Sequence, residues 1–536
     1  MTNRLAIIGS GATSIYTLKY LLASPILLNL TVFESSNEIG KGMPYRKDTN
    51  AHYMLCNAFS REIPIVTGSL IEWLKNQPEY ELNDWELSSH ELSARAFYPR
   101  LLIGEFLADE FTKLCGKFKD KGHRVNVKIG ERVMDIAIRS NGKIDVTTDL
   151  SKENYEFDQV VIASGHSWPS KPTIGKAALV SPWPYTVVTA LKPGNIGILG
   201  SSLSAIDVVV ALGNTHGTFT ESNETVIWKP NKNSTNVKFT MLSKMGIMPE
   251  GDFYYPYPYV PLLIFSPEVV VGEVKKGVDG LLNRLFELLC KELDNSAPRY
   301  LDSLGKDARS IVGFLKAYFK SRQDLGGLTA VKTDFAKARQ SMREKKTIEY
   351  RYVLLRAHEN FDLALRSLDN HDWKLFSDCL APIFSDSYAA VPHLSLARVI
   401  AMFNAGVLSL KATGEEAVFT QDARGGVHVK TETETLSYDV MIDARGQAAA
   451  SVNDLPFPAL VKNLDENSEP IKAPFKIKTR RSEAISIYCL ALPQILERHP
   501  FSQGLANCDE NGKIVAEEIL KTFATQDVVD NSLLDS

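Results

Sequence analysis

The sequence lacks the features that mark zinc-binding, secreted and membrane-spanning proteins. It has no C-x-x-C pair, so neither a zinc knuckle nor a redox dithiol is indicated. It also has no apolar run long enough to cross a bilayer, and its first residues resemble no secretion signal. We therefore expect reduced thiols and a cytoplasmic protein. The cysteines are Cys56, Cys115, Cys290, Cys379, Cys489 and Cys508.

A large net charge of one sign is also absent. The chain has 60 basic and 64 acidic residues, a formal charge of -4, so no overall field attracts nucleic acid or an anionic membrane. Hydrophobic residues make up 44% and charged residues 23%, which is typical of a globular protein with a large core. We expect a small-molecule substrate and neither a nucleic-acid partner nor a membrane partner.

What the sequence does contain is a repeated β-α-β pattern. An apolar strand at 5–8 leads through glycines into helical spacing at 12–22 and a second strand at 30–35. The pattern recurs at 195–212, with a later strand at 237–244, and from 266 to 390 the apolar spacing is helical. The pattern predicts an α/β fold with two Rossmann-like dinucleotide-binding domains and a mostly helical insertion.

The first glycine turn, Gly9-Ser10-Gly11-Ala12-Thr13-Ser14, has the composition of a pyrophosphate-binding turn. Gly9 permits the tight turn, Gly11 lets the backbone approach a pyrophosphate, and the following helix presents free N–H groups and a positive dipole end. Ser14 stands where a third glycine or alanine is usual, and it is small enough for close helix packing. A glycine-rich loop without a ligand is the alternative interpretation of this stretch alone.

Glu34 ends the next strand, 25 residues after Gly9. This is close to the spacing expected for an acid that accepts hydrogen bonds from an adenosine ribose. The alternative is a solvated carboxylate at the end of a strand. The order of strand, glycines, helix and acid favours nucleotide binding.

The second glycine turn, Gly200-Ser201-Ser202-Leu203-Ser204-Ala205, has serine in place of the middle glycine. A pyrophosphate would still reach the helix end, although less closely. The following strand closes on Lys244, a cation suited to a 2′-phosphate, so we expect NADPH rather than NADH. Alternatively, Lys244 is a surface lysine and this unit is only structural.

Two further strands end in a small residue and a glycine, where the chain can run close to a bound nucleotide. They are Phe157 to Pro169, with Gly165, and Tyr438 to Gln447, with Asp443 and Gly446. For each strand, the alternative interpretation is an ordinary transition from a strand to a turn, without a bound ligand.

These motifs together resemble two-dinucleotide-binding-domain flavoproteins, and more narrowly the bacterial YdhS-like FAD/NAD(P)-binding proteins. The narrower resemblance rests on stretches spread over nearly the whole chain: Gly40 to Tyr45, Phe97 to Leu107, Leu242 to Pro261, Glu349 to Glu359 and Phe501 to Cys508.

The resemblance implies FAD in the first unit, with the adenosine near Glu34 and the pyrophosphate on the turn from Gly9 to Ser14. It implies that Arg100 reaches a flavin phosphate or carbonyl, with a structural salt bridge as the alternative. It also implies that Gly504 forms a flavin-contacting turn before a helix.

The domain boundaries expected from these patterns divide the FAD-binding domain into two segments. Its first part spans 1–190, the NAD(P)-binding domain 191–265 and the helical insertion 266–390. Residues 391–536 then return to the FAD-binding domain and end in a closing helix.

Several other side chains have two interpretations each. The functional interpretation of His166 is a proton shuttle or a hydrogen-bond partner of a nucleotide, and the alternative is a structural histidine. Asp252 stands among aromatics that either line a substrate pocket or pack a rigid loop, and His393 and Arg398 are equally ambiguous. The basic stretch 331–351 either attracts an anion or forms a solvated helix face.

The expected activity is that of an FAD-dependent oxidoreductase. NAD(P)H would reduce the flavin, which would pass electrons to oxygen or a small substrate, as in flavin monooxygenases. The alternatives are a reductase for a quinone or partner protein and a nucleotide-binding sensor without turnover. No metal ion is expected.

Overall fold

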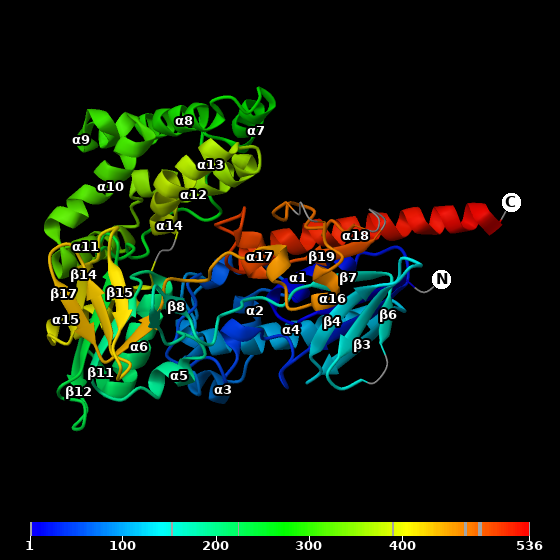
Figure 1. Cartoon of the computed structure of the whole chain (residues 1–536), viewed down its shortest axis with the longest axis horizontal. Helices are drawn as coiled ribbons and strands as arrows, with labels where there is room; N and C mark the ends of the chain where they lie inside the picture. The colour runs from blue at the N-terminus through cyan, green and yellow to red at the C-terminus, as the bar shows by residue number, and fades with distance from the viewer. Residues whose placement is uncertain are drawn as a thin grey trace. The chain divides into compact units, whose positions relative to one another are not determined.

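The structure is a computed structural model that describes residues 3–151, 154–222, 225–388, 391–465, 469–480 and 485–534, the last nine without side chains (Figure 1). Its contacts divide the chain into two compact units. The first unit combines Met1–Ser167 with Gln447–Ser536, and the second unit is Trp168–Gly446. The second unit is therefore an insertion in the first. Among the described residues, no helix is both long and apolar enough to span a bilayer.

The first unit is built on a parallel sheet with strand order β19-β7-β1-β2-β3. Its strands are β1 (Asn3–Ile8), β2 (Leu28–Glu34), β3 (Arg124–Ile129), β7 (Gln159–Ile162) and β19 (Ser486–Cys489). Leu5, Ala6 and Ile7 are fully buried, because helices cover both faces of a parallel sheet. All these strands end at one edge, and the order reverses between β1 and β7, where α/β sheets bind ligands.

Three long helices pack in the first unit: α1 (Ala12–Leu21), α4 (Arg100–Asp120) and α18 (Leu505–Leu534). A side chain at Gly512 would bring its Cβ within 2.8 Å of the Thr17 nitrogen, so α18 touches α1 through its backbone. Lys19 and Asp509 join the same two helices at 2.7 Å. The remaining elements are α2 (Leu70–Lys75), α3 (Glu79–Asn83), α16 (Pro458–Val461), α17 (Leu492–Leu496) and the antiparallel strands β4 (Val133–Ile138), β5 (Ile144–Thr148) and β6 (Tyr155–Phe157).

The second unit repeats the design with a parallel sheet of order β14-β13-β10-β18. Its strands are β10 (Asn195–Leu199), β13 (Lys238–Ser243), β14 (Leu408–Ala412) and β18 (Val440–Asp443). Helix α6 (Leu203–His216) follows β10, and α15 (His393–Asn404) precedes β14. The smaller elements are α5 (Tyr185–Thr189), the β11 (Gly217–Ser222) and β12 (Thr225–Pro230) hairpin, β8 (Thr173–Ile174) with β9 (Ala177–Ala178), and β15 (Val418–Gln421), β16 (Val427–Lys430) and β17 (Thr435–Tyr438).

Between β13 and α15 the chain first runs as a loop and then forms helices from Pro267 to Tyr388, drawn green to yellow-green in Figure 1. They are α7 (Pro267–Lys275), α8 (Leu281–Ser296), α9 (Tyr300–Leu304), α10 (Ile311–Leu325), α11 (Gly327–Glu344), α12 (Glu349–Leu365), α13 (Asn370–Leu375) and α14 (Ala381–Tyr388). In α8 the apolar residues recur every four positions and are fully buried: Leu281, Leu285, Leu289 and Leu293.

The contacts place the return to the first unit later than the expected residue 391. Residues 391–446 belong to the second unit, because β14 pairs with β13 and β18 pairs with β10. Residues 168–190 also belong there rather than to the first segment. The strand before Gly446 has the same pattern as the strand before Gly165, and such a pattern does not specify which sheet the strand joins.

Buried ion pairs connect the helices to the loop after β13. Arg322 on α10 contacts Asp386 on α14 at 2.6 Å and donates a hydrogen bond to the Met248 carbonyl at 3.3 Å. Arg351 on α12 lies 2.6 Å from Glu250 and donates to the Gly251 carbonyl at 2.8 Å. All four charged side chains are buried, so removal of one partner leaves an uncompensated charge.

We predict that Asp386→Ala lowers the free energy of unfolding by about 3–5 kcal/mol, because Arg322 is left buried without its partner. The matched control is Asp324→Ala, which breaks the exposed Lys320–Asp324 pair at 3.0 Å. This control should lower the free energy of unfolding by about 1 kcal/mol or less. Chemical denaturation of the full chain measures both, and equal losses would contradict the prediction.

Candidate functional site: two glycine turns

The first glycine turn depends on a residue without Cβ immediately after β1. Gly9 has φ +99°, and a Cβ at this position would lie 2.5 Å from the Ala163 carbonyl oxygen, just beyond β7. Its N–H donates to the Phe33 carbonyl at 2.7 Å, which ties the turn to β2. Any side chain at residue 9 would therefore separate β1 from the chain leaving β7.

The next turn residues shape the start of α1. Gly11 is the N-cap, and a Cβ there would lie 3.1 Å from the Gly42 Cα. The Ser14 hydroxyl donates to the Gly9 carbonyl at 2.6 Å, so the departure from glycine adds a bond that closes the turn. The first amides of a helix have no intrahelical acceptor, so the Ala12 and Thr13 amides at this positive end can bind an anion.

Glu34 is buried and binds the turn itself. Its Oε2 accepts from the Ser10 amide at 3.1 Å and hydroxyl at 2.7 Å, and its Oε1 accepts from the Ser36 amide at 2.8 Å. Arg46, which the sequence analysis missed, lies 3.9 Å from Oε1. Because each carboxylate oxygen accepts more than one hydrogen bond, these contacts leave room for a ribose hydroxyl. The ribose contact stays a prediction.

A loop from Gly40 to Tyr45 forms one wall beside the first glycine turn. The Gly40 amide donates to the Ser10 hydroxyl at 2.9 Å. A Cβ at Gly40 would lie 2.6 Å from the Ala108 Cα, and one at Gly104 would lie 2.3 Å from the Tyr45 carbonyl oxygen. The loop and α4 are thus in backbone contact. The glycines at 40, 42 and 104 were the signal for this packing.

Arg100 and His166 lie on the same side of the first unit. Arg100 begins α4 and is buried, with its amide bound to the Met54 carbonyl at 2.8 Å. Burial lowers the pKa of His166 to about 4, the Gln447 side chain opposes this, and the Arg100 charge lowers it further. The His166 Nδ1 is buried and has no hydrogen-bond partner among the described residues. His166 is therefore neutral near pH 7 with one ring nitrogen available.

Gly504 precedes α18 and has φ +108°. One turn into that helix, the Cys508 thiol accepts a hydrogen bond from the Thr13 hydroxyl at 3.4 Å. The first turns of α1 and α18 therefore lie together, and their positive ends add. Burial raises the pKa of Cys508, so its sulfur is a neutral thiol there.

The residues of the first unit fit FAD. The turn without Cβ atoms, the free amides of α1, the Arg100 charge and the unpartnered Nδ1 of His166 provide donors and space for a bound dinucleotide. Gly165 lies at the same sheet edge with φ +71°, and the space around it is open among the described residues.

The second glycine turn has the geometry of the first. Gly200 follows β10 with φ +130°, and a Cβ there would lie 2.3 Å from the Ala444 carbonyl oxygen, just beyond β18. Its N–H donates to the Leu242 carbonyl at 2.7 Å. Ser202 is the N-cap of α6, and Ser204 lies in its first turn. The free amides of α6 thus face the same edge as the ends of β13 and β18, which fits a second dinucleotide.

The other predicted residues of this unit lie at the same edge but already have partners. Lys244 follows β13 and pairs with Glu415 at 2.6 Å, with both side chains exposed. An exposed pair of this kind contributes little, so Lys244 remains available to a ligand. Asp443 binds the Arg445 guanidinium at 2.7 and 2.8 Å, and Gly446 follows with φ +101°.

The remaining candidates occupy other parts of the second unit. Asp252 is buried, and the rings after it pack together, with Tyr255 and Tyr259 stacked at 5.9 Å. His393 Nε2 lies 2.7 Å from the Asp252 carbonyl oxygen and donates to it, whereas Arg398 contacts Glu221 at 3.2 Å. Neither glycine turn includes these residues.

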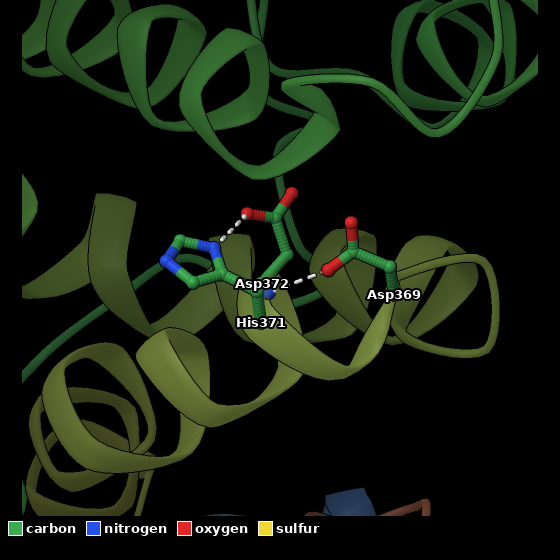
Figure 2. A group of neighbouring side chains, drawn as sticks. All are labelled: Asp369, His371 and Asp372. Atoms are coloured by element: carbon green, nitrogen blue, oxygen red, sulfur yellow. Dashed lines mark hydrogen bonds and ion pairs between the residues drawn. The ribbon is translucent and has the colours of Figure 1, made fainter.

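Asp369, His371 and Asp372 gather at the start of α13 (Figure 2). Their contacts serve the helix: Asp369 accepts the Asp372 amide at 2.8 Å as N-cap, and Asp372 accepts the Leu282 amide at 3.1 Å. The His371 ring is exposed and lies 3.5 Å from Asp372. Capping and the link to α8 account for both carboxylates.

Comparison with known proteins covers nearly the whole chain. Residues 6–167 match the "FAD-NAD(P)-binding" family model, and residues 266–388 match the "YdhS-like middle domain". The chain is 34% identical to the uncharacterised protein YdhS of Escherichia coli (strain K12) over 523 residues, 97% of each chain. The first unit therefore contains an FAD-NAD(P)-binding domain, and the expected fold class is confirmed.

Three solved structures match the chain over most of its length at low sequence identity. The ornithine N-hydroxylase KtzI of Kutzneria sp. 744 is 14% identical with a TM-score of 0.47, covering 97% of this chain and 99% of that one. The L-lysine 6-monooxygenase of Pseudomonas syringae is also 14% identical with a TM-score of 0.47, and the match covers 97% of this chain and 100% of that one. The bacillithiol disulfide reductase of Staphylococcus aureus is 12% identical with a TM-score of 0.43, and the match covers 97% of this chain and 99% of that one. Likeness at this level does not identify a reaction.

We predict that Gly11→Leu yields protein without bound flavin, because the side chain would push the Gly42 loop away and enter the pyrophosphate position. The control Gly116→Leu lies on exposed α4 surface with open space and keeps the flavin. The visible spectrum of each purified variant measures this. A yellow Gly11→Leu protein would refute the assignment of the first turn.

We also predict that His166 contributes to acid sensitivity. Its pKa is lowered from 6.5 to about 4 in the folded chain, so the unfolded chain binds more protons in this window. The stability contributed by the neutral ring is complete above pH 6.5 and is lost as the pH falls toward 4. His166→Asn should flatten the pH dependence of the unfolding free energy there, as measured by denaturation at stepped pH. An unchanged slope would exclude this role.

Proposed function

Because the chain belongs to the family of YdhS-like FAD/NAD(P)-binding proteins, we propose that it is an FAD-dependent oxidoreductase that uses NAD(P)H as its electron donor. FAD, when bound, supplies a hydride acceptor that can later pass electrons to oxygen or to a small substrate. Within this proposal the leading subclass is a monooxygenase-like reaction.

The observation that carries the proposal is the repetition of one turn geometry in both units. Gly9 and Gly200 each lie against an alanine carbonyl beyond the neighbouring strand, and each donates to a strand carbonyl at 2.7 Å. A single nucleotide site needs only one such turn. Two turns provide for a donor dinucleotide and an acceptor dinucleotide in the same chain.

The chain's own groups have defined tasks in this proposal. The amides at the starts of α1 and α18 hold negative charge, and Glu34 keeps the first turn in shape. Arg100 adds a fixed positive charge beside His166, whose neutral ring can accept or donate a hydrogen bond. The amides of α6 and Lys244 hold the phosphates of the second dinucleotide.

A reductase that passes electrons to a quinone or a partner protein is the alternative within the same chemistry. A disulfide relay is not favoured, because the sequence has no C-x-x-C pair. A nucleotide-binding sensor without turnover is the alternative outside enzymology, and the serine in place of the second turn's middle glycine motivates it.

The decisive experiment is the anaerobic visible spectrum of the purified protein before and after NADPH is added. We expect a flavin absorption band that bleaches when NADPH is added. A band that persists would remove NADPH as the donor and favour the sensor or another donor. A substrate screen with an oxygen-uptake readout then separates the alternatives, because only a monooxygenase-like reaction consumes oxygen in step with an added small substrate.

We predict that Lys244→Glu weakens NADPH binding by roughly tenfold and NADH binding much less, because only NADPH carries the 2′-phosphate. The control Lys232→Glu makes the same charge change at an exposed position before β13. Titration of each variant with both cofactors measures the effect. Equal losses for the two cofactors would remove Lys244 from the site.

A further inference from the structure

The Gln447 side chain joins the two ends of the first unit. The chain leaves this unit after Ser167 and re-enters it at Gln447. The Gln447 Oε1 accepts a hydrogen bond from the Ser167 amide at 3.0 Å. The Gln447 Nε2 donates to the Ser167 carbonyl at 2.8 Å and to the Ala448 carbonyl at 3.2 Å. These three backbone groups fix which end of the Gln447 amide is oxygen and which is nitrogen.

His166 lies between two anchored residues of the segment that follows β7. On one side, the Gly165 carbonyl accepts a hydrogen bond from the Leu492 amide at 3.1 Å. On the other side, both backbone groups of Ser167 are bound by Gln447. A Cβ on Gly165 would meet no atom within 4 Å, so there is open space beside this residue among the described residues. The His166 backbone is therefore held in place next to room for a ligand.

The His166 ring bonds the same glutamine. Burial lowers the pKa of His166 to about 4, hydrogen bonding to the Gln447 side chain opposes this, and the Arg100 charge adds to it. A hydrogen bond that raises the pKa of a histidine is one that the ring donates. Because Nδ1 is buried without a partner among the described residues, the ring nitrogen that bonds Gln447 is Nε2.

The hydrogen bonds of Gln447 decide the tautomer of this ring. The two hydrogens of the Gln447 Nε2 go to the Ser167 and Ala448 carbonyls, so this amide has no donor left for His166. The Gln447 Oε1 has two lone pairs, and the Ser167 amide uses one of them. His166 therefore donates its Nε2–H to that oxygen. Since a neutral imidazole carries one proton, the His166 Nδ1 has a lone pair and no hydrogen.

We propose that Gln447 is a positioning residue that fixes His166 as the Nε2–H tautomer, and that the free Nδ1 accepts a hydrogen bond from FAD. A flavin offers suitable donors in its imide N–H and its ribityl hydroxyl groups. A buried acceptor without a partner is unfavourable, and a donor on the ligand removes that penalty. The flavin contact rests on the proposed binding of FAD in the first unit, whereas the tautomer does not.

Solid-state ¹⁵N NMR of the full chain, labelled at the histidine ring nitrogens, reads the tautomer directly. The signals that disappear in His166→Asn are those of His166. We expect a protonated Nε2 and an unprotonated Nδ1 at pH 7, both with and without FAD. The Nδ1–H tautomer, or an equal mixture of the two tautomers, would overturn the proposal.

The same signals test the flavin contact. Addition of FAD to the flavin-free full chain should shift the Nδ1 signal of His166, because a donor then meets its lone pair, and should shift the Nε2 signal much less. An Nδ1 signal that FAD leaves unchanged would overturn the contact. An Nδ1 signal that shifts with FAD in a protein that NADPH does not bleach would support this inference and overturn only the proposed electron donor.

Matched glutamine variants test the positioning role. Gln447→Met removes the acceptor of the ring, so it should give a mixture of tautomers and weaken FAD binding by about three- to tenfold, the value of one hydrogen bond. The control is Gln421→Met, because Gln421 also bonds the backbone through both ends, to the Ala178 amide at 3.3 Å and the Gly425 carbonyl at 3.0 Å. The control should change neither quantity. Equal effects of the two variants would overturn the positioning role.

Gln447→Glu provides a second test that holds even if Gln447→Met fails to fold. The carboxylate keeps an acceptor for the ring but cannot donate to the Ser167 carbonyl. Its charge favours the protonated ring, while Arg100, the charged group that acts on His166 in the described part of the chain, is unchanged. The midpoint of the ¹⁵N titration of His166 should therefore rise by about one pH unit or more. A midpoint that does not move would overturn the proposal.

Discussion

The organisation of both units depends on a residue without Cβ immediately after the first strand. At Gly9 and at Gly200 the carbonyl of an alanine beyond the neighbouring strand fills the place of the missing methyl group, 2.5 and 2.3 Å from it. This contact lets the turn pass close to the chain that leaves the neighbouring strand. The following helix starts directly after this turn, so its free amides lie at the sheet edge where the strand order reverses.

The glycine turns and the helical insertion could be predicted from the sequence. The glycines after apolar strands predicted both turns, and the helical spacing of apolar residues from 266 to 390 predicted the helices of the insertion. The sequence analysis expected Ser14 only to be small enough for close helix packing. In the structure its hydroxyl also donates a hydrogen bond to the Gly9 carbonyl, which helps to close the first turn. Local patterns suffice where a requirement is local, such as a positive φ or one apolar face of a helix.

Other features depended on distant residues and had no local signal. The strand before Gly446 has the pattern of either sheet, and only its pairing with β10 assigns it to the second unit. Arg46 approaches Glu34 through a loop whose course is fixed by Gly40 against α4. The buried Arg322–Asp386 pair joins residues 64 positions apart, and their sequence neighbours do not reveal it. Tertiary packing therefore decides these contacts.

The insertion of one unit within the other has a consequence for the order of synthesis. The first unit needs β19 beside β7 and α18 beside α1, yet both elements leave the ribosome after the whole of Trp168–Gly446. Until then β7 is an open edge, and α1 has no helix against its Thr17 side. The second unit has all its strands by residue 443. The unit that begins first is therefore completed last, and the nascent chain carries an unfinished sheet while the inserted unit folds.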